Sequence, residues 1–188
     1  RARIPMAVDF DTRYFPGQLQ GFPADGYTAA FARMLEGIEV RLRVDYKDDR
    51  GLARIARRTF YTGRLDELYD FQHGVLPYRS VRFETKNVTL PYLGCAVINC
   101  PDPSQPWHRL TDHSYFTGAE QAEGPATYEY AAEDGVACYP IPTRQAMTML
   151  SAYETLAASD GIDLGGRAGR HQLLNIDQAI ADGMRKQP

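Results

Sequence analysis

The sequence predicts an α+β fold in which a block of antiparallel strands is flanked by helices and by α/β segments at both ends of the chain. The first observation is that residues 79–139 contain short β-branched and aromatic runs separated by Pro and Gly, which is typical of an antiparallel sheet. The second is that apolar residues recur at helical spacing on both sides of this block. We therefore predict two units, with residues 1–78 and 140–188 forming one and residues 79–139 forming the other.

The segment before the strand-rich block is predicted to alternate between helix and strand. Asp25 is a candidate N-cap for a short helix that Gly37 ends. Residues 38–44 alternate between apolar and charged side chains, which makes them the clearest strand by pattern. The other elements expected in this part are a brief helix at 51–57, a short strand at 59–61 and a helix at 65–71.

The strand-rich block and the last third of the chain follow in order. After the block, Thr143 caps a helix that Asp160-Gly161 ends, and a strand at 162–164 leads into Gly165-Gly166. Asn175 then caps a final helix. Strands inside the block are expected at 80–85, 95–99, 107–116 and 127–130.

Composition argues against several classes of protein. A net charge of -3 over 188 residues gives no basic surface for nucleic acid. No apolar run approaches the roughly 20 residues of a membrane helix and no signal peptide opens the chain, so a cytoplasmic protein without membrane contact is predicted. The three cysteines lack C-x2-C spacing, and His108 and His113 would face opposite sides of a strand, so no metal site is predicted. Because the chain starts at Arg1 instead of Met, we expect an expressed fragment, a processed product or an excised domain.

Arginines beside aromatic or glycine residues are the most informative candidates for a binding site. Their segments have the pattern of partly buried chain, where an unpaired guanidinium is costly, so each needs an anionic partner. That partner is either a carboxylate of the protein or a phosphate of a bound nucleotide. Tyrosines that bury a ring while the hydroxyl reaches a ligand extend the set, with core packing as the alternative. The candidates are Arg3, Arg79, Arg82, Arg109, Arg167, Tyr14, Tyr78 and Tyr139.

Two glycine-containing segments follow short strands, where the backbone can pass close to a ligand. Gly165-Gly166-Arg167 also places a cation there. Thr62-Gly63 ends the strand at 59–61 and is a candidate edge for a cofactor. Both motifs are unspecific by themselves, and the sequence contains no Gly-x-Gly-x-x-Gly, no Walker loop and no Gly-x-Ser-x-Gly.

Eleven short segments, taken together, resemble the pattern of the UDP-galactopyranose mutase family. They run collinearly over nearly the whole chain, so their order is far more specific than any single segment. The segments are Arg3-Ile-Pro, Asp11-Thr-Arg-Tyr-Phe15, Gln20-Gly-Phe-Pro, Asp25-Gly-Tyr-Thr28, Tyr61-Thr-Gly63, Leu76-Pro-Tyr-Arg-Ser80, Arg82-Phe-Glu84, Gly94-Cys-Ala-Val-Ile-Asn99, Trp107-His-Arg-Leu-Thr-Asp-His113, Tyr139-Pro140 and Gly165-Gly-Arg167.

The resemblance implies an enzyme that interconverts UDP-galactopyranose and UDP-galactofuranose with reduced FAD, on a split FAD-binding flavoprotein fold. In that family two arginines and several tyrosines bind the diphosphate of the nucleotide sugar, and a further arginine contacts the flavin. By motif position, the diphosphate-binding residues implied here are Arg3, Tyr14, Arg109 and Tyr139, and the residues implied on the FAD side are Arg167, Gly166, Thr62 and Gly63.

Four positions depart from the family pattern. The family has a substrate-binding tyrosine where this chain has Leu173, and an acidic residue where it has Asn175. It has a tyrosine at the position of Cys138 and an arginine at the position of Ala7. The change at Leu173 removes a phosphate donor, and a hydrogen bond to a charged group contributes about 1.5 to 3 kcal/mol.

The resemblance leaves two main hypotheses. The family's glycine-rich FAD fingerprint lies before the segment equivalent to Arg1, so the first hypothesis is part of a mutase that is inactive as an isolated chain and binds flavin weakly. Exposed apolar surface at that junction would favour self-association, for example as a homodimer. The alternative is a non-catalytic domain derived from the family that binds a nucleotide sugar or a protein, which Leu173 and Asn175 favour. A piece of another flavoprotein, such as an amine oxidase, would not explain the block at 107–113.

Overall fold

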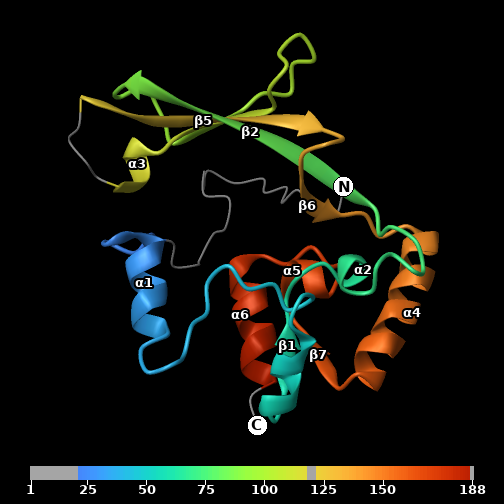
Figure 1. Ribbon diagram of the computed structural model, residues 1–188. Coiled ribbons are helices and arrows are strands. Elements are labelled where there is room, and N and C mark those ends of the chain that lie inside the picture. Colours follow the sequence, from blue (N-terminus) through green and yellow to red (C-terminus); the bar gives the residue numbers. More distant parts are fainter. Residues whose placement is uncertain (1–20, 118–121, 187–188) are drawn as a thin grey trace.

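The computed structural model describes residues 21–117 and 122–186, and it combines an antiparallel sheet with helices gathered around a short parallel sheet (Figure 1). This mixture of helix and antiparallel sheet confirms the α+β prediction at the level of fold class. Within the described residues, none of the helices has both the length and the apolar character needed to cross a bilayer. The helices are α1 (Gly26–Met34), α2 (Leu65–Leu68), α3 (Ser114–Thr117), α4 (Arg144–Ser159), α5 (Gly166–Gly169) and α6 (Ile176–Arg185), with a 3-10 turn, η1 (Arg50–Ile55).

The antiparallel sheet has the strand order β3-β4-β5-β2-β6. Its central pair is β2 (Tyr78–Thr89) and β5 (Glu123–Ala132), which stay in register from Ser80 opposite Ala132 to Thr89 opposite Glu123. The shorter strands are β3 (Val97–Asn99), β4 (Arg109–Asp112) and β6 (Val136–Pro140). The four strands β2, β3, β4 and β5 overlap the runs predicted from the sequence, whereas β6 was not predicted.

The parallel sheet consists of β1 (Thr59–Tyr61) and β7 (Ile162–Leu164), and both strands have the predicted bounds. Tyr61 pairs with Leu164 at the end of the sheet. Because the two strands run in the same direction, the residues that follow them emerge at one edge. Thr62 and Gly165, about a hundred positions apart in the sequence, therefore become neighbours.

The main apolar core lies where α4 packs against α2 and β7. Thr143 caps α4 as predicted, since its hydroxyl accepts the Ala146 N–H at 3.0 Å. Tyr153 of α4 is fully buried, and its hydroxyl donates to the Gly74 carbonyl at 2.7 Å and accepts the His73 N–H at 3.0 Å. The ring is thus buried with its polar atom satisfied. The buried cluster comprises Leu65, Leu68, Tyr69, Leu76, Leu150, Tyr153, Ala157 and Ile162.

The strand predicted at 38–44 is wrong, because this segment consists of turns and irregular chain. Val40 and Leu42 are 50% and 82% exposed, and Arg43 has a φ of 59°. An alternating pattern becomes a strand only where a neighbouring strand satisfies its backbone groups. Among the described residues no strand pairs with this segment, so its amphipathic pattern has no sheet to join.

Two helix predictions differ in detail. The helix predicted at 65–71 is shorter, because Asp70 and Phe71 adopt positive φ values of 51° and 56° that a right-handed helix cannot include. Asp25 lies at the N-cap of α1 as predicted, but its side chain makes no cap hydrogen bond. It forms an ion pair with Arg33 at 3.1 Å instead.

The strand predicted at 107–116 is shorter in the structure, because β4 ends at the buried carboxylate of Asp112. Asp112 ends β4 and is fully buried, and it accepts the backbone N–H groups of Tyr92 and Leu93 at 3.0 and 3.1 Å. It also accepts the Ser114 hydroxyl at 2.6 Å, which turns the chain into α3. Burial acts to raise the pKa of Asp112, but these hydrogen bonds outweigh it and hold the pKa below its usual value.

A second buried carboxylate, Asp66, connects α2 to the segment that leads into β2. It accepts Arg64 Nη2 at 2.7 Å and Arg64 Nε at 3.2 Å. It also accepts the backbone N–H of Leu76 at 3.0 Å. Because Asp66 is fully buried, its removal would leave the Leu76 N–H and the Arg64 guanidinium without this acceptor.

We expect Asp66→Ala to lower the free energy of unfolding by about 1 to 3 kcal/mol, because the buried Leu76 N–H loses its acceptor while Arg64 keeps its ion pair with Glu67. Urea unfolding followed by circular dichroism measures this change. The matched control is Glu154→Ala, which removes an exposed carboxylate from α4 and should alter the free energy by less than about 0.5 kcal/mol. An Asp66→Ala protein as stable as the unmodified chain would contradict the anchoring role.

Candidate functional site

Arg109 belongs to a row of side chains that crosses the five-stranded sheet. It pairs with Asn99 of β3 on one side and with Glu129 of β5 on the other. Glu129 in turn pairs with Phe83 of β2. Residues directly opposite one another on neighbouring strands point to the same face, so these four side chains share one face of the sheet.

The neighbours of Arg109 hold its guanidinium. Nε donates to Asn99 Oδ1 at 3.0 Å, and Nη1 donates to the two Glu129 carboxylate oxygens at 3.5 and 3.4 Å. Arg109 therefore has an internal carboxylate partner, while its Nη2 has no hydrogen-bond partner among the described residues. The sequence analysis assigned neither residue to the site, although Asn99 ends one of the eleven family-like segments. An acidic residue inside an aromatic strand was the available signal for Glu129.

Arg82 and Arg79 have different surroundings. Arg82 lies over the Tyr130 ring, with its guanidinium carbon 4.3 Å from the ring centroid. Since side chains alternate along β2, Arg82 is on the opposite face from Phe83 and hence from Arg109. Arg79 is exposed at the start of β2. The sheet therefore separates Arg82 from Arg109.

Of the four residues assigned to the diphosphate, the structure places Arg109 and Tyr139. Arg3 and Tyr14 lie outside the described residues. Tyr139 of β6 is opposite Arg79 of β2, next to a register shift between Arg79 and Ser80. Arg109 and Tyr139 thus belong to the same sheet, with β5 and β2 between their strands.

Arg167 joins β6 to the turn before α6. Its guanidinium carbon is 5.6 Å from the centroid of the Tyr139 ring. Nε and Nη2 donate to the Leu174 carbonyl at 3.1 and 2.7 Å, and Nη1 donates to the Cys138 carbonyl at 3.2 Å. Burial raises the pKa of the Cys138 thiol, although the charge of Arg167 opposes this. The partners of Arg167 in the described chain are therefore carbonyls and an aromatic ring.

The residues assigned to the FAD side meet at the carboxyl ends of β1 and β7. The Gly165 N–H donates to the Tyr61 carbonyl at 3.0 Å. A Cβ at Gly165 or Gly166 would lie 3.7 Å from the side chain of Thr62. Gly63 is close to Tyr61, whose hydroxyl would be 2.5 Å from a Cβ there. The structure thus brings Thr62, Gly63 and Gly166 together.

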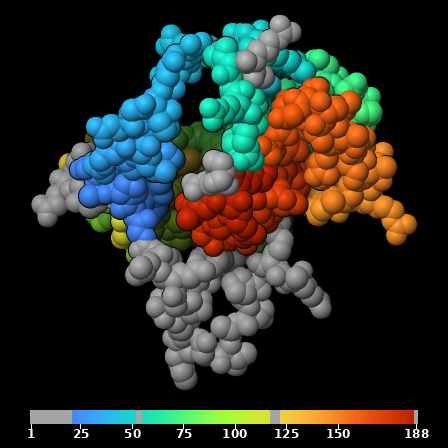
Figure 2. All heavy atoms as spheres, turned by 90° about the horizontal axis from the view of Figure 1, so that it is seen from below, coloured from blue at the N-terminus to red at the C-terminus, as the bar shows by residue number. Residues whose placement is uncertain are grey.

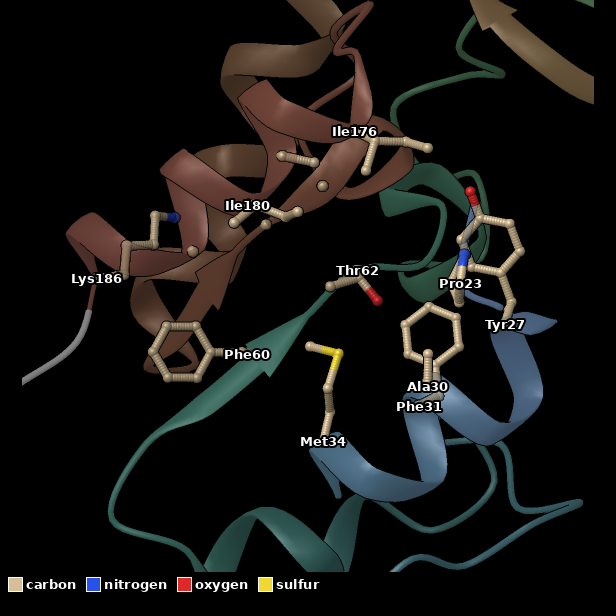
Figure 3. A pocket seen from close by; sticks show the side chains of 14 residues that line it. Pro23, Tyr27, Ala30, Phe31, Met34, Phe60, Thr62, Ile176, Ile180 and Lys186 are labelled. Carbon is tan, nitrogen blue, oxygen red and sulfur yellow. The ribbon is translucent and has the colours of Figure 1, made fainter. Parts of the chain in front are cut away.

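An apolar cavity of about 700 Å³ opens beside these residues. Figure 3 shows Phe31 and Met34 of α1, Phe60 of β1, Thr62 just after β1, and Ile180 of α6 around this space. In the space-filling view, α1 and α6 lie on the same face of the molecule (Figure 2). The Gly165-Gly166 backbone closes the cavity at the edge of the parallel sheet.

The cavity suits the ring system of a flavin better than its pyrophosphate. Phe31, Phe60 and Ile180 offer apolar contacts to a planar ring, and Gly166 lets the backbone approach it closely. Lys186, the cation in the lining, already donates to the Leu164 carbonyl. Pyrophosphate is usually held by amides at the start of a helix that follows a glycine-rich loop, and that motif is absent from the sequence.

The departures at Leu173 and Asn175 lie in the turn between α5 and α6. Asn175 is the N-cap of α6 as predicted and forms a capping box with Gln178, whose Oε1 accepts the Asn175 N–H at 2.9 Å. The capping box therefore explains why an asparagine is found at position 175, and no contact with a ligand is needed to explain it. Among the described residues no group of three His, Cys, Asp or Glu side chains is arranged to hold a metal ion.

We expect Gly166→Ala to lower the free energy of unfolding by about 1 to 2 kcal/mol, because its φ of +69° is unfavourable for an L-residue. Gly165→Ala is the matched control, since Gly165 has an extended φ of -140° and room for a methyl group. That control should be neutral or stabilising by a few tenths of a kcal/mol up to about 1. Thermal unfolding of both variants measures the difference, and equal effects would show that φ at Gly166 does not matter.

Comparison with known proteins identifies the family. A family model described as UDP-galactopyranose mutase matches residues 1–173. A probable UDP-galactopyranose mutase of Klebsiella pneumoniae is 34% identical over 97% of this chain and 49% of its own length. A dTDP-fucopyranose mutase of Escherichia coli is 27% identical, covering 97% of this chain and 52% of its own length. A UDP-galactopyranose mutase of Mycoplasma genitalium is also 27% identical, covering 98% and 51%. The chain thus spans about half the length of the curated relatives it matches, and it belongs to the UDP-galactopyranose mutase family.

Proposed function

We propose that this chain is part of a mutase that interconverts UDP-galactopyranose and UDP-galactofuranose through reduced FAD, and that it is inactive by itself. Family membership supports the reaction class. The observation that carries the proposal is the held guanidinium of Arg109, which has one nitrogen left without a hydrogen-bond partner among the described residues. The absence of Gly-x-Gly-x-x-Gly from this sequence supports inactivity of the isolated chain.

Arg109 and Tyr139 would act on the leaving group of the reaction. Negative charge gathers on the diphosphate as the glycosidic bond breaks, so preorganised donors contribute most in the transition state. The Nη2 of Arg109 supplies a charge-assisted donor, and the Tyr139 hydroxyl supplies a neutral one. We propose that Arg3 and Tyr14 complete this diphosphate site.

Thr62, Gly63, Gly166 and Arg167 would form the flavin side. Bound reduced FAD supplies the electron-rich nitrogen that the family's chemistry requires at the anomeric carbon. The chain's own contribution is an apolar wall that excludes water and a glycine backbone that permits close approach. Arg167, through its bonds to the carbonyls of Leu174 and Cys138, holds this edge against β6 and Tyr139.

The alternative is a non-catalytic domain of the same family that binds a nucleotide sugar or a protein. Leu173 favours it, because a leucine cannot donate a hydrogen bond to phosphate. The reading frame that encodes Arg1 separates the two hypotheses: an upstream strand followed by Gly-x-Gly-x-x-Gly supports the enzyme. The division into two units, the cytoplasmic location and a homodimer formed through exposed apolar surface stay predictions.

Arg109→Ala should weaken UDP binding by at least about tenfold, because a hydrogen bond to a charged group contributes about 1.5 to 3 kcal/mol. Binding by the isolated chain is expected to be weak, so chemical-shift titration with UDP is the suitable measurement. The matched control is Arg82→Ala, which removes an arginine from the opposite face of the same sheet and should leave the affinity unchanged.

Two results would count against this site. If the Arg109 and Arg82 variants lose the same affinity for UDP, the affinity depends on the net charge of the protein and not on the position of Arg109. Micromolar or tighter binding of UDP by the isolated chain would contradict the view that the chain holds only part of the pocket.

A further inference from the structure

The guanidinium of Arg109 is fixed from two sides by residues of neighbouring strands. Asn99 accepts from Nε at 3.0 Å, and Glu129 accepts from Nη1 at 3.4 and 3.5 Å. These contacts engage two of the three guanidinium nitrogens, and the third, Nη2, has no hydrogen-bond partner in the described part of the chain. A free arginine loses much rotamer freedom when it binds an anion, so an arginine that is already held binds at a lower entropic cost.

Glu129 faces the side chains of Arg109 and His108 more than it faces solvent. Its side chain is 12% exposed, compared with 38% for Arg109. A second neighbour, His108, has its Nε2 3.6 Å from Glu129 Oε2. The carboxylate is therefore placed to restrain Arg109 from within the sheet, while Arg109 keeps the more exposed position.

We propose that Glu129, together with Asn99, is a positioning residue that orients Arg109 so that its Nη2 edge faces the diphosphate of a nucleotide sugar. This inference rests on the proposed function of Arg109. The negative charge of Glu129 itself works against binding, because it repels a phosphate nearby. Glu129 therefore favours diphosphate binding by orienting Arg109 and opposes it through its own negative charge.

Glutamine and alanine at position 129 separate the two effects. Glu129→Gln keeps an acceptor oxygen for Nη1 and removes the charge, whereas Glu129→Ala removes both. If orientation matters, the alanine variant must bind UDP more weakly than the glutamine variant even though both have lost the same charge.

The experiment is nitrogen-15 NMR on the full 188-residue chain, observing the Nε–H of Arg109 and titrating with UDP. We expect its order parameter to stay high in Glu129→Gln and to fall toward values of flexible groups, below about 0.6, in Glu129→Ala. We expect UDP binding to be roughly 3- to 10-fold weaker in Glu129→Ala than in Glu129→Gln. When Arg109→Ala is added to each variant, this difference should vanish, because Glu129 acts through Arg109.

The matched control is Glu84→Ala in β2. Glu84 is a carboxylate on the opposite face of the same sheet, where it accepts the Tyr130 hydroxyl at 2.7 Å, and its loss should change neither readout. The inference alone is overturned if Arg109→Ala lowers UDP affinity but the alanine and glutamine variants of Glu129 have equal order and equal affinity. If Arg109→Ala leaves UDP affinity unchanged, the proposed role of Arg109 is overturned and this inference with it.

Discussion

The register of the five-stranded sheet is the constraint on which the candidate diphosphate site depends. Side chains alternate between the two faces of a strand, so a slip of β4 by one residue would move Arg109 to the opposite face and separate it from Glu129. The long pairing of β2 with β5 fixes the centre of the sheet. Burial of Leu110, which is 5% exposed, then favours the observed alignment of β4 with β5, because a slip of β4 would turn Leu110 to the opposite face.

The parallel pairing of β1 with β7 imposes the second constraint. It brings Thr62 beside Gly165 and Gly166, which places a backbone without Cβ atoms at the end of an apolar cavity. Arg167 then ties this edge to the larger sheet through the Cys138 carbonyl. One guanidinium thus connects the proposed flavin side to Tyr139 on the proposed diphosphate side.

Sequence patterns were sufficient where a segment carries its own boundary signals. The strands at 59–61 and 162–164 are followed by Thr-Gly and Gly-Gly, and the long helix after Thr143 has a capping residue and a terminal Gly161, so all were predicted closely. The segment at 38–44 has an equally clear alternation, yet it forms no strand, because a strand also needs a partner that local sequence does not specify.

The sequence supplied candidate residues for the site but not their partners in the fold. The resemblance to the family selected Arg109 and Tyr139, and the structure places them on two strands of the same sheet, β4 and β6. Glu129 and Asn99 were missed because they are 20 and 10 positions from Arg109, and only strand register brings them to it. The convergence of Arg3 with Arg109 stays a prediction, since Arg3 is outside the described residues.

Two arginines far apart in the chain, Arg3 and Arg109, are proposed to bind one diphosphate. Comparing the affinities of UDP and uridine for the unmodified chain, for Arg3→Ala and for Arg109→Ala tests this proposal most directly, because the difference between these ligands isolates the phosphates. We predict that UDP binds better than uridine and that each substitution reduces this advantage by about tenfold or more. An advantage that survives unchanged in either variant would contradict the account.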